Sequence, residues 1–233
     1  MAVFLGDIAV VGLGVSCQTA FQLEDQRETL ERLSGHPAEY RATPFDWLIS
    51  PPEAVSAMLA EDLFFPPDQA ELEVRVTPCW TRHNVHYLHE PGIMGGNGVV
   101  RSKFDHTSTT LRRVRQAKRR VFIASNTQRN LPDMDGRIND GWYRFTDANV
   151  DRMRGAIEDY FGPSVLHIVT QPDRHTVSGA PEWLHEIDND PPGEKVTLRG
   201  YAPAWRPVIE AALTSRPNTQ LAVPQNRRRG HGW

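Results

Sequence analysis

Short apolar runs recur along the chain, separated by longer amphipathic stretches. Residues 8–13, 120–125 and 164–170 ("IAVVGL", "RVFIAS", "SVLHIVT") carry almost no charge, which is typical of parallel strands buried on both faces. Residues 71–76, "ELEVRV", alternate and predict a half-exposed strand. Residues 83–90, "HNVHYLHE", are β-prone, and residues 194–201 predict a weaker strand.

Between these runs, apolar residues recur at helical spacing. They predict helices over residues 19–33, 52–59, 147–160 and 205–213, and a basic amphipathic stretch over residues 109–119. Alternating strands and helices favour an α/β fold with a central, mostly parallel sheet flanked by helices. In such sheets, functional sites lie at the carboxyl ends of the strands.

The composition fits a globular protein with a substantial core. The 233 residues are 39% hydrophobic and 24% charged, and the formal charge of −3 gives no bias toward nucleic acid or membrane. Asp7 interrupts the N-terminal apolar stretch, and no Lys or Arg precedes it, so we expect a first strand rather than an export signal and a cytoplasmic protein. Residues 1–215 form one predicted domain, and residues 216–233 a disordered tail.

Cys17 follows the first apolar run and precedes the first predicted helix. A helix N-terminus lowers the pKa of a thiol, and its free amides stabilise an oxyanion. Gln18 adds a side-chain amide beside the thiol. Two other interpretations stay open: a cysteine buried for packing, or a nucleotide-binding turn in which Gly12 and Gly14 match two glycines of G-x-G-x-x-G and Cys17 replaces the third.

Several segments together resemble a known family. "GLGVSCQTAFQL", "TPFDWLISPPEAVSAML", "HYLHEPG" and "RRVFIAS" follow one another in the order and approximate spacing of the bacterial DUF1796 family, described as papain-like cysteine peptidases of unknown function. The resemblance covers roughly residues 7–126, and "PFDWLIS" is its most distinctive part. It implies a papain-like arrangement, which the pattern of strands and helices does not distinguish from a flavodoxin-like or SGNH-like one. It also implies a Cys-His site for hydrolysis or acyl transfer, with Cys17 as the nucleophile.

A thiol nucleophile needs an imidazole within hydrogen-bond reach. His89 is the first candidate, because it ends the predicted strand and occupies the family's His-acid position; His86 and His106 follow. A third group should orient the imidazole. Asn126 follows Cys and His in the papain-like chain order, and Asp46 of "PFDW" competes with it, unless Asp46 binds its own backbone in a turn.

Other chemistry is less favoured. His83, His86 and His89 do not form a ligand set, since alternating strand side chains separate them and no cysteine or carboxylate completes a site. We therefore expect no metal and no cofactor. Residues 111–120, "LRRVRQAKRR", carry six basic residues; without interleaved aromatic residues they favour a solvated helix face over nucleic-acid binding.

The sequence thus predicts a cysteine-nucleophile hydrolase or acyltransferase. Its substrate would be a peptide, an amide or an acyl small molecule. Cys17 would attack, His89 would carry the proton, Asn126 or Asp46 would orient the ring, and Gln18 would help to hold the oxyanion. The alternatives are a non-catalytic binding domain with the same fold and a nucleotide-binding protein that uses the Gly12–Gly14 turn.

Overall fold

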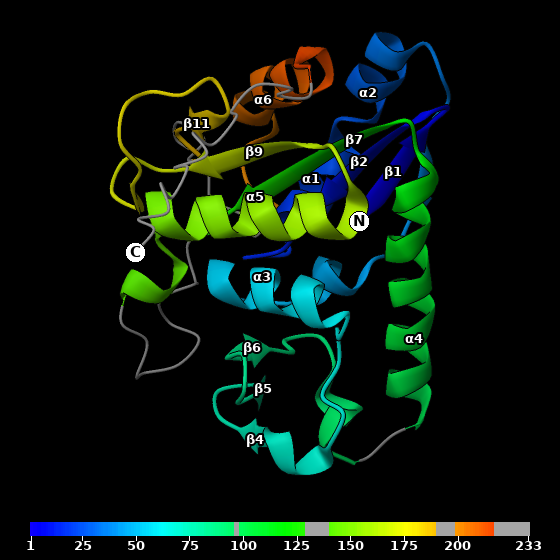
Figure 1. Cartoon of the computed structure of the whole chain (residues 1–233), viewed down its shortest axis with the longest axis vertical. Coiled ribbons are helices and arrows are strands. Elements are labelled where there is room, and N and C mark those ends of the chain that lie inside the picture. The colour runs from blue at the N-terminus through cyan, green and yellow to red at the C-terminus, as the bar shows by residue number, and fades with distance from the viewer. Residues whose placement is uncertain (96–97, 129–139, 190–198, 217–233) are drawn as a thin grey trace, which may run out of the picture.

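The fold is built around a six-stranded mixed sheet. The structure, a computed structural model, describes residues 1–95, 98–128, 140–189 and 199–216 (Figure 1). The strand order is β11-β9-β7-β2-β1-β3; β2, β7, β9 and β11 run parallel, whereas β1 is antiparallel to both of its neighbours. This confirms the predicted α/β class. The strands are β1 (Ala2–Leu5), β2 (Ile8–Gly12), β3 (Glu39–Arg41), β7 (Arg119–Ser125), β9 (Val165–Thr170) and β11 (Leu184–Glu186).

Alternation along the buried strands divides the core into two layers. In β7, Phe122 and Ala124 pack on one face of the sheet, and Val121 and Ile123 pack on the other. Helices cover both faces, so the parallel strands are removed from water on both sides. The first layer lies against α3 (Pro52–Glu61), α4 (Gly98–Arg113) and α5 (Asp147–Phe161); the second lies against α1 (Gln18–Asp25), α2 (Arg27–Ser34) and α6 (Ala202–Thr214) (Figure 1).

A smaller antiparallel sheet lies beyond α3, on the far side of the molecule from α6 (Figure 1). It is formed by β4 (Leu72–Val74), β5 (Pro78–Trp80) and β6 (Val85–His86). A short parallel pair is formed by β8 (Phe145–Thr146) and β10 (His175–Thr176). In the chain, β8 directly precedes α5. Single turns of 3-10 helix complete the description: η1 (Pro44–Trp47), η2 (Gln69–Glu71), η3 (Pro91–Gly95), η4 (Val114–Gln116) and η6 (Asp140–Tyr143).

The predicted strands and helices are confirmed where local pattern dominates. The three apolar runs form β2, β7 and β9, and the predicted helices at 52–59, 147–160 and 205–213 form α3, α5 and α6. The prediction over residues 19–33 is wrong, because the helix breaks at Gln26 into α1 and α2. The Gln26 side chain donates to the Ala202 carbonyl at 2.7 Å, so a contact with the start of α6 holds this break.

Other differences concern short or non-local strands. The first strand is half of a hairpin, since β1 and β2 are joined by the Gly6–Asp7 turn with Gly6 in a left-handed conformation. Strand β4 covers only residues 72–74 of "ELEVRV", and β6 only residues 85–86 of "HNVHYLHE". The predicted strand over residues 194–201 and the predicted tail over residues 216–233 lie mostly outside the described residues.

Arg113, Arg115 and Lys118 of the basic segment are exposed, as expected for a solvated face, and arginines of the segment also bind carbonyl groups of the protein. The helix expected over residues 109–119 ends at Arg113, having begun at Gly98. Arg115 donates to the Tyr160 carbonyl at 2.7 Å, Arg119 to the Ser215 carbonyl at 2.6 Å, and Arg120 to the Pro163 carbonyl at 3.2 Å. Arginine donors therefore meet the carbonyl-rich C-terminal ends of α5 and α6, where cations are favoured.

A buried histidine, His167 of β9, and a half-buried one, His185 of β11, lie together beside the end of α6. The rings of His167 and His185 stack with centroids 5.1 Å apart, and their Nδ1 and Nε2 atoms share a hydrogen bond of 2.8 Å. The Nε2 atom of His167 also lies 2.9 Å from the Ser215 hydroxyl. Burial, followed by the nearby His185 and Arg119 charges, lowers the pKa of His167 to about 3. Burial also lowers the pKa of His185.

Candidate functional site

The carboxyl end of β2 carries a strained turn into α1. After Gly12 the chain passes through two left-handed residues, Gly14 with φ of 70° and Val15 with φ of 60°, and reaches Cys17 as the residue that precedes α1. A β-branched residue is rarely found in this conformation, and such strain is concentrated at functional sites. The predicted position of Cys17, between a parallel strand and a helix N-terminus, is therefore the one observed.

The Cys17 thiol is enclosed and neutral. Its side chain is 2% exposed, and Sγ donates to Oε1 of Gln128 at 3.4 Å. Burial raises the pKa of this thiol to about 11, although its own backbone amide lowers it in part. This direction is opposite to the lowering that we expected from the helix N-terminus, because the loss of solvation outweighs the amides at this depth. At neutral pH the group is a thiol rather than a thiolate.

Gln18 and Asn126 lie at the same edge of the sheet as Cys17, and their side chains are held by hydrogen bonds within the protein. The Gln18 side-chain oxygen accepts hydrogen bonds from the Thr127 hydroxyl and from Nδ2 of Asn189, the latter at 3.0 Å. Nδ2 of Asn126 donates to the Tyr143 carbonyl at 2.7 Å and the Arg174 carbonyl at 2.8 Å. These side chains are at most 1% exposed, so the carboxyl edge is a closed polar network.

His89 and Asp46 make their contacts with residues other than those of this network. His89 is exposed in a turn and contacts the Trp47 ring edge-on at 5.2 Å, and within the described residues it shares no hydrogen bond with Cys17. Asp46 accepts from the Thr43 amide at 2.9 Å and the Thr43 hydroxyl at 2.6 Å, and pairs with the Met1 amine. The turn-capping role of Asp46 is therefore the one observed.

The other candidate histidines do not replace His89. His86 is fully buried in β6, and its Nδ1 lies 3.1 Å from the Thr77 hydroxyl. His106 is exposed on α4. Among the described residues, no hydrogen bond joins either ring to the Cys17 thiol. The Cys-His pair of the hydrolase hypothesis is therefore not assembled here, and which imidazole would serve Cys17 stays a prediction.

Both glycines of the nucleotide-binding alternative have reasons within the protein. A Cβ at Gly12 would lie 3.1 Å from the Thr19 methyl group, so the close approach of α1 to β2 requires the glycine. Gly14 has a positive φ, and a Cβ there would lie 3.3 Å from Oγ of Ser50. Both glycines are thus explained by contacts within the protein, and the nucleotide-binding alternative stays a prediction.

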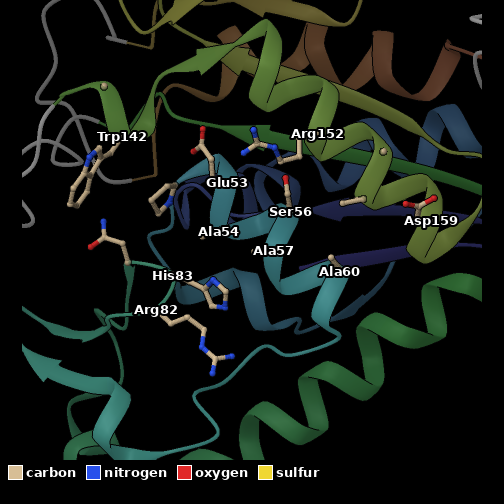
Figure 2. Close-up of a pocket in the computed structure, with 15 residues that line it drawn as sticks. Glu53, Ala54, Ser56, Ala57, Ala60, Arg82, His83, Trp142, Arg152 and Asp159 are labelled. Carbon is tan, nitrogen blue, oxygen red and sulfur yellow. The ribbon is translucent and has the colours of Figure 1, made fainter. Parts of the chain in front are cut away.

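A second site, not predicted from the sequence, is a cleft beside α3. The cleft encloses about 910 Å³ and lies between α3, α5 and the loop over residues 82–84 (Figure 2). Small residues form its floor and one wall: Ala54, Ser56, Ala57 and Ala60 of α3, and Gly155 and Ala156 of α5. A sequence signal existed in the small residues spaced three apart on α3 and in the mid-helix Gly155.

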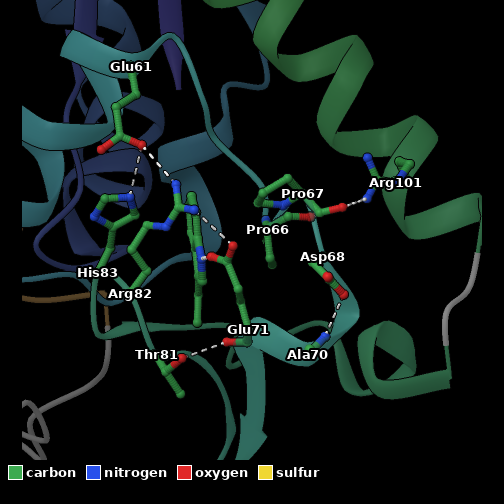
Figure 3. Close-up of polar contacts among 11 residues, drawn as sticks. Glu61, Pro66, Pro67, Asp68, Ala70, Glu71, Thr81, Arg82, His83 and Arg101 are labelled. Carbon is green, nitrogen blue, oxygen red and sulfur yellow. Dashed lines mark hydrogen bonds and ion pairs between the residues drawn. The ribbon is translucent and has the colours of Figure 1, made fainter.

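The loop side of the cleft is held in place by glutamates. Arg82 donates to Glu61 at 3.3 Å and to Glu71 at 2.9 Å, and Nε2 of His83 lies 3.5 Å from the same Glu61 carboxylate (Figure 3). The His83 ring also packs edge-on against Trp80 at 4.4 Å. Burial lowers the pKa of His83, with Glu61 opposing the shift. The loop therefore presents fixed rather than mobile side chains to the cleft.

The charged residue on the α3 side of the cleft has a hydrogen-bond partner, whereas those on the α5 side have none among the described residues. Glu53 accepts from Nδ2 of Asn149 at 3.1 Å. Arg152 and Asp159, both on α5, form no hydrogen bond or ion pair with any other described residue. Figure 2 places these two side chains at different points along the cleft. The cleft thus combines an apolar floor with charged groups that are free to meet a ligand.

Further observations bound the chemistry. Among residues 1–95, 98–128, 140–189 and 199–216, no three His, Cys, Asp or Glu side chains gather in a way that would hold a metal ion. Across the same residues, every helix is too short or too polar to cross a membrane.

A scan against models of protein families finds no match to this chain, and searches of curated proteins and of solved structures find none either. The DUF1796 resemblance therefore stays an expectation based on the quoted motifs.

Proposed function

We propose that this chain is a ligand-binding α/β protein whose ligand occupies the cleft between α3, α5 and the 82–84 loop. The observation that carries the proposal is the cleft itself. It has a volume of about 910 Å³, a floor of small side chains, and charged groups at its wall that have no partner among the described residues. Ligand sites are typically concave, mostly apolar and furnished with a few polar groups, with volumes of roughly 300–1,000 Å³. This corresponds to the binding-domain alternative predicted from the sequence.

The test compares the cleft with the carboxyl edge. We expect a screen of small organic fragments by protein-observed NMR to shift amides of α3 and α5, Ala57 and Gly155 among them. Ala57→Phe places a ring in the cleft and should remove these shifts, whereas Cys17→Ala should leave them in place. Thermal denaturation of both variants checks that they fold. Fragment shifts that survive Ala57→Phe, or that gather around Cys17, would contradict the proposal.

A second candidate is the hydrolase or acyltransferase that uses Cys17 on a peptide, amide or acyl substrate. The strained Val15 just before Ser16 and Cys17, at the carboxyl edge of a parallel sheet, favours it. The raised pKa of the thiol and its glutamine partner weigh against it. Cys17→Ala should abolish labelling by a thiol-reactive acyl probe without unfolding the protein. Labelling that is unchanged in this variant would end the candidate.

A further inference from the structure

The cleft is lined by equal numbers of acidic and basic side chains, but only some of them have a hydrogen-bond or ion-pair partner among the described residues. Glu53 and Asp159 are acidic, and Arg82 and Arg152 are basic. Two carboxylates already hold Arg82, and an amide holds Glu53. Arg152 and Asp159 remain without a partner in the described residues. A ligand that fills the cleft would shield both groups from water, and each would then need an opposite charge.

The spacing of these two groups defines a length. Arg152 and Asp159 are seven residues apart on α5, which is close to two helical turns, so their side chains leave the same side of the helix. At a rise of 1.5 Å per residue, their backbone positions are about 10 Å apart along the helix axis. Arg152 and Asp159 are labelled at separate points on the upper wall of the cleft in Figure 2.

The surface of α5 between Arg152 and Asp159 carries only small residues at the cleft. Gly155 and Ala156 occupy this stretch and line the cleft. Glycine in the middle of a helix is destabilising relative to alanine, yet a Cβ added at Gly155 would meet no atom within 4 Å. Packing within the described protein therefore gives no reason for this glycine. The close approach of a ligand backbone or alkyl chain to α5 does give one.

We propose that the cleft binds an elongated zwitterion. Its anionic group would lie at Arg152, its cationic group at Asp159, and an apolar spacer of about 10 Å would cross Gly155 and Ala156. A ligand with a single charge would leave one of the two side chains desolvated and unpaired. The inference rests on the cleft being the ligand site, and it adds the chemical class of the ligand.

The probe is 8-aminooctanoate, compared with octanoate and octylamine by isothermal titration calorimetry on the full chain. In its extended form, 8-aminooctanoate separates its charges by about two helical turns. We expect it to bind at least about tenfold more tightly than either singly charged analogue, because each charge-assisted contact is worth about one order of magnitude in affinity. Added salt should narrow this difference.

Two variants test whether the anionic group of the ligand lies at Arg152 and its cationic group at Asp159. Arg152→Gln should weaken the binding of 8-aminooctanoate and octanoate without weakening that of octylamine. Asp159→Asn should weaken the binding of 8-aminooctanoate and octylamine without weakening that of octanoate. Arg154→Gln is the matched control: Arg154 is on the same helix, pairs with Asp151 at 3.1 Å, and does not line the cleft. It should change none of the three affinities.

Gly155→Ala separates recognition from stability. It should raise the melting temperature by about 1–4 °C through helix propensity, and should weaken 8-aminooctanoate by at least about fivefold, since the methyl group occupies the path of the spacer. A loss of folding cannot explain weaker binding in a more stable variant.

Two outcomes would overturn the inference: equal affinities for the three compounds, or no binding of 8-aminooctanoate. If fragments still bind the cleft and Ala57→Phe removes them, only the zwitterion inference fails. If the fragments bind elsewhere, the proposed function fails as well.

Discussion

Because His167 is buried and paired with His185, the stability of this protein should fall in mild acid. The perturbation is a shift from pH 7 to pH 5, applied to the wild type and to His167→Gln. His167 is 2% exposed, and its two ring nitrogens are engaged by His185 and Ser215. Protonation would bury a charge beside His185 and Arg119, so the folded protein keeps the ring neutral.

The magnitude follows from the two pKa values of His167, about 3 in the folded protein and 6.5 in the unfolded chain. Above pH 6.5 both states hold the ring neutral, so stability does not depend on this group. Below pH 6.5 the unfolded chain binds a proton that the folded protein does not bind, and stability falls until the pH reaches the folded pKa. At pH 5 the loss is about 2 kcal/mol. His185, whose pKa is also lowered, adds to it in the same direction.

The assay is urea unfolding at pH 7 and pH 5, followed by tryptophan fluorescence. The free energy of unfolding of the wild type should fall by at least about 2 kcal/mol between the two pH values, and that of His167→Gln by about 2 kcal/mol less. Glutamine retains a donor and an acceptor for the neighbouring groups. His106→Gln, on the exposed face of α4, is the control and should lose as much as the wild type. Equal losses in the wild type and in His167→Gln would refute the reasoning.

Three further predictions concern Cys17, Asn189 and Asp46. The Cys17 thiol should react with iodoacetamide far more slowly in the folded protein than in urea at pH 8, because its pKa is raised to about 11 and its side chain is 2% exposed; mass spectrometry of the modified peptide measures this. Asn189 links Gln18 to Trp205, since its Nδ2 donates to the Gln18 side-chain oxygen at 3.0 Å and its Oδ1 accepts from the indole nitrogen at 3.2 Å. Asn189→Ala should therefore lower the free energy of unfolding in urea by at least about 2 kcal/mol. An unchanged urea midpoint would contradict this linking role. Asp46→Ala should lower the free energy of unfolding by about 1–2 kcal/mol in the same assay, because the turn cap is lost. The rate of Cys17 labelling should not change, and faster labelling would indicate that Asp46 contributes to the Cys17 site.

The sequence predicted what short-range pattern determines. The apolar runs at β2, β7 and β9 are recognisable because both of their faces are buried, and their parallel pairing brings Cys17, Gln18 and Asn126 to one edge, as expected. Long-range contacts determined the rest. The break at Gln26 depends on a carbonyl that lies 176 residues further along the chain. No local pattern could have indicated it.

The site was harder to predict than the fold for a related reason. The pKa of Cys17 depends on how deeply it lies beneath the surrounding chain, and the helix-terminus argument contains no information on depth. His89 was placed at the end of a strand, but that strand ends three residues earlier, at His86, and the ring turns toward Trp47. The cleft joins segments around residues 57, 83 and 155, which are far apart in the sequence.

The hydrogen bonds from arginines to the C-terminal ends of the helices limit how far the chain can be shortened. Arg119, at the start of β7, donates to the Ala212 and Ser215 carbonyls at the end of α6, and α6 also shields Val121 and Ile123. A fragment that stops before α6 would expose one face of the central strands and leave a guanidinium group without its acceptors. The smallest piece that retains an intact sheet therefore extends to Ser215.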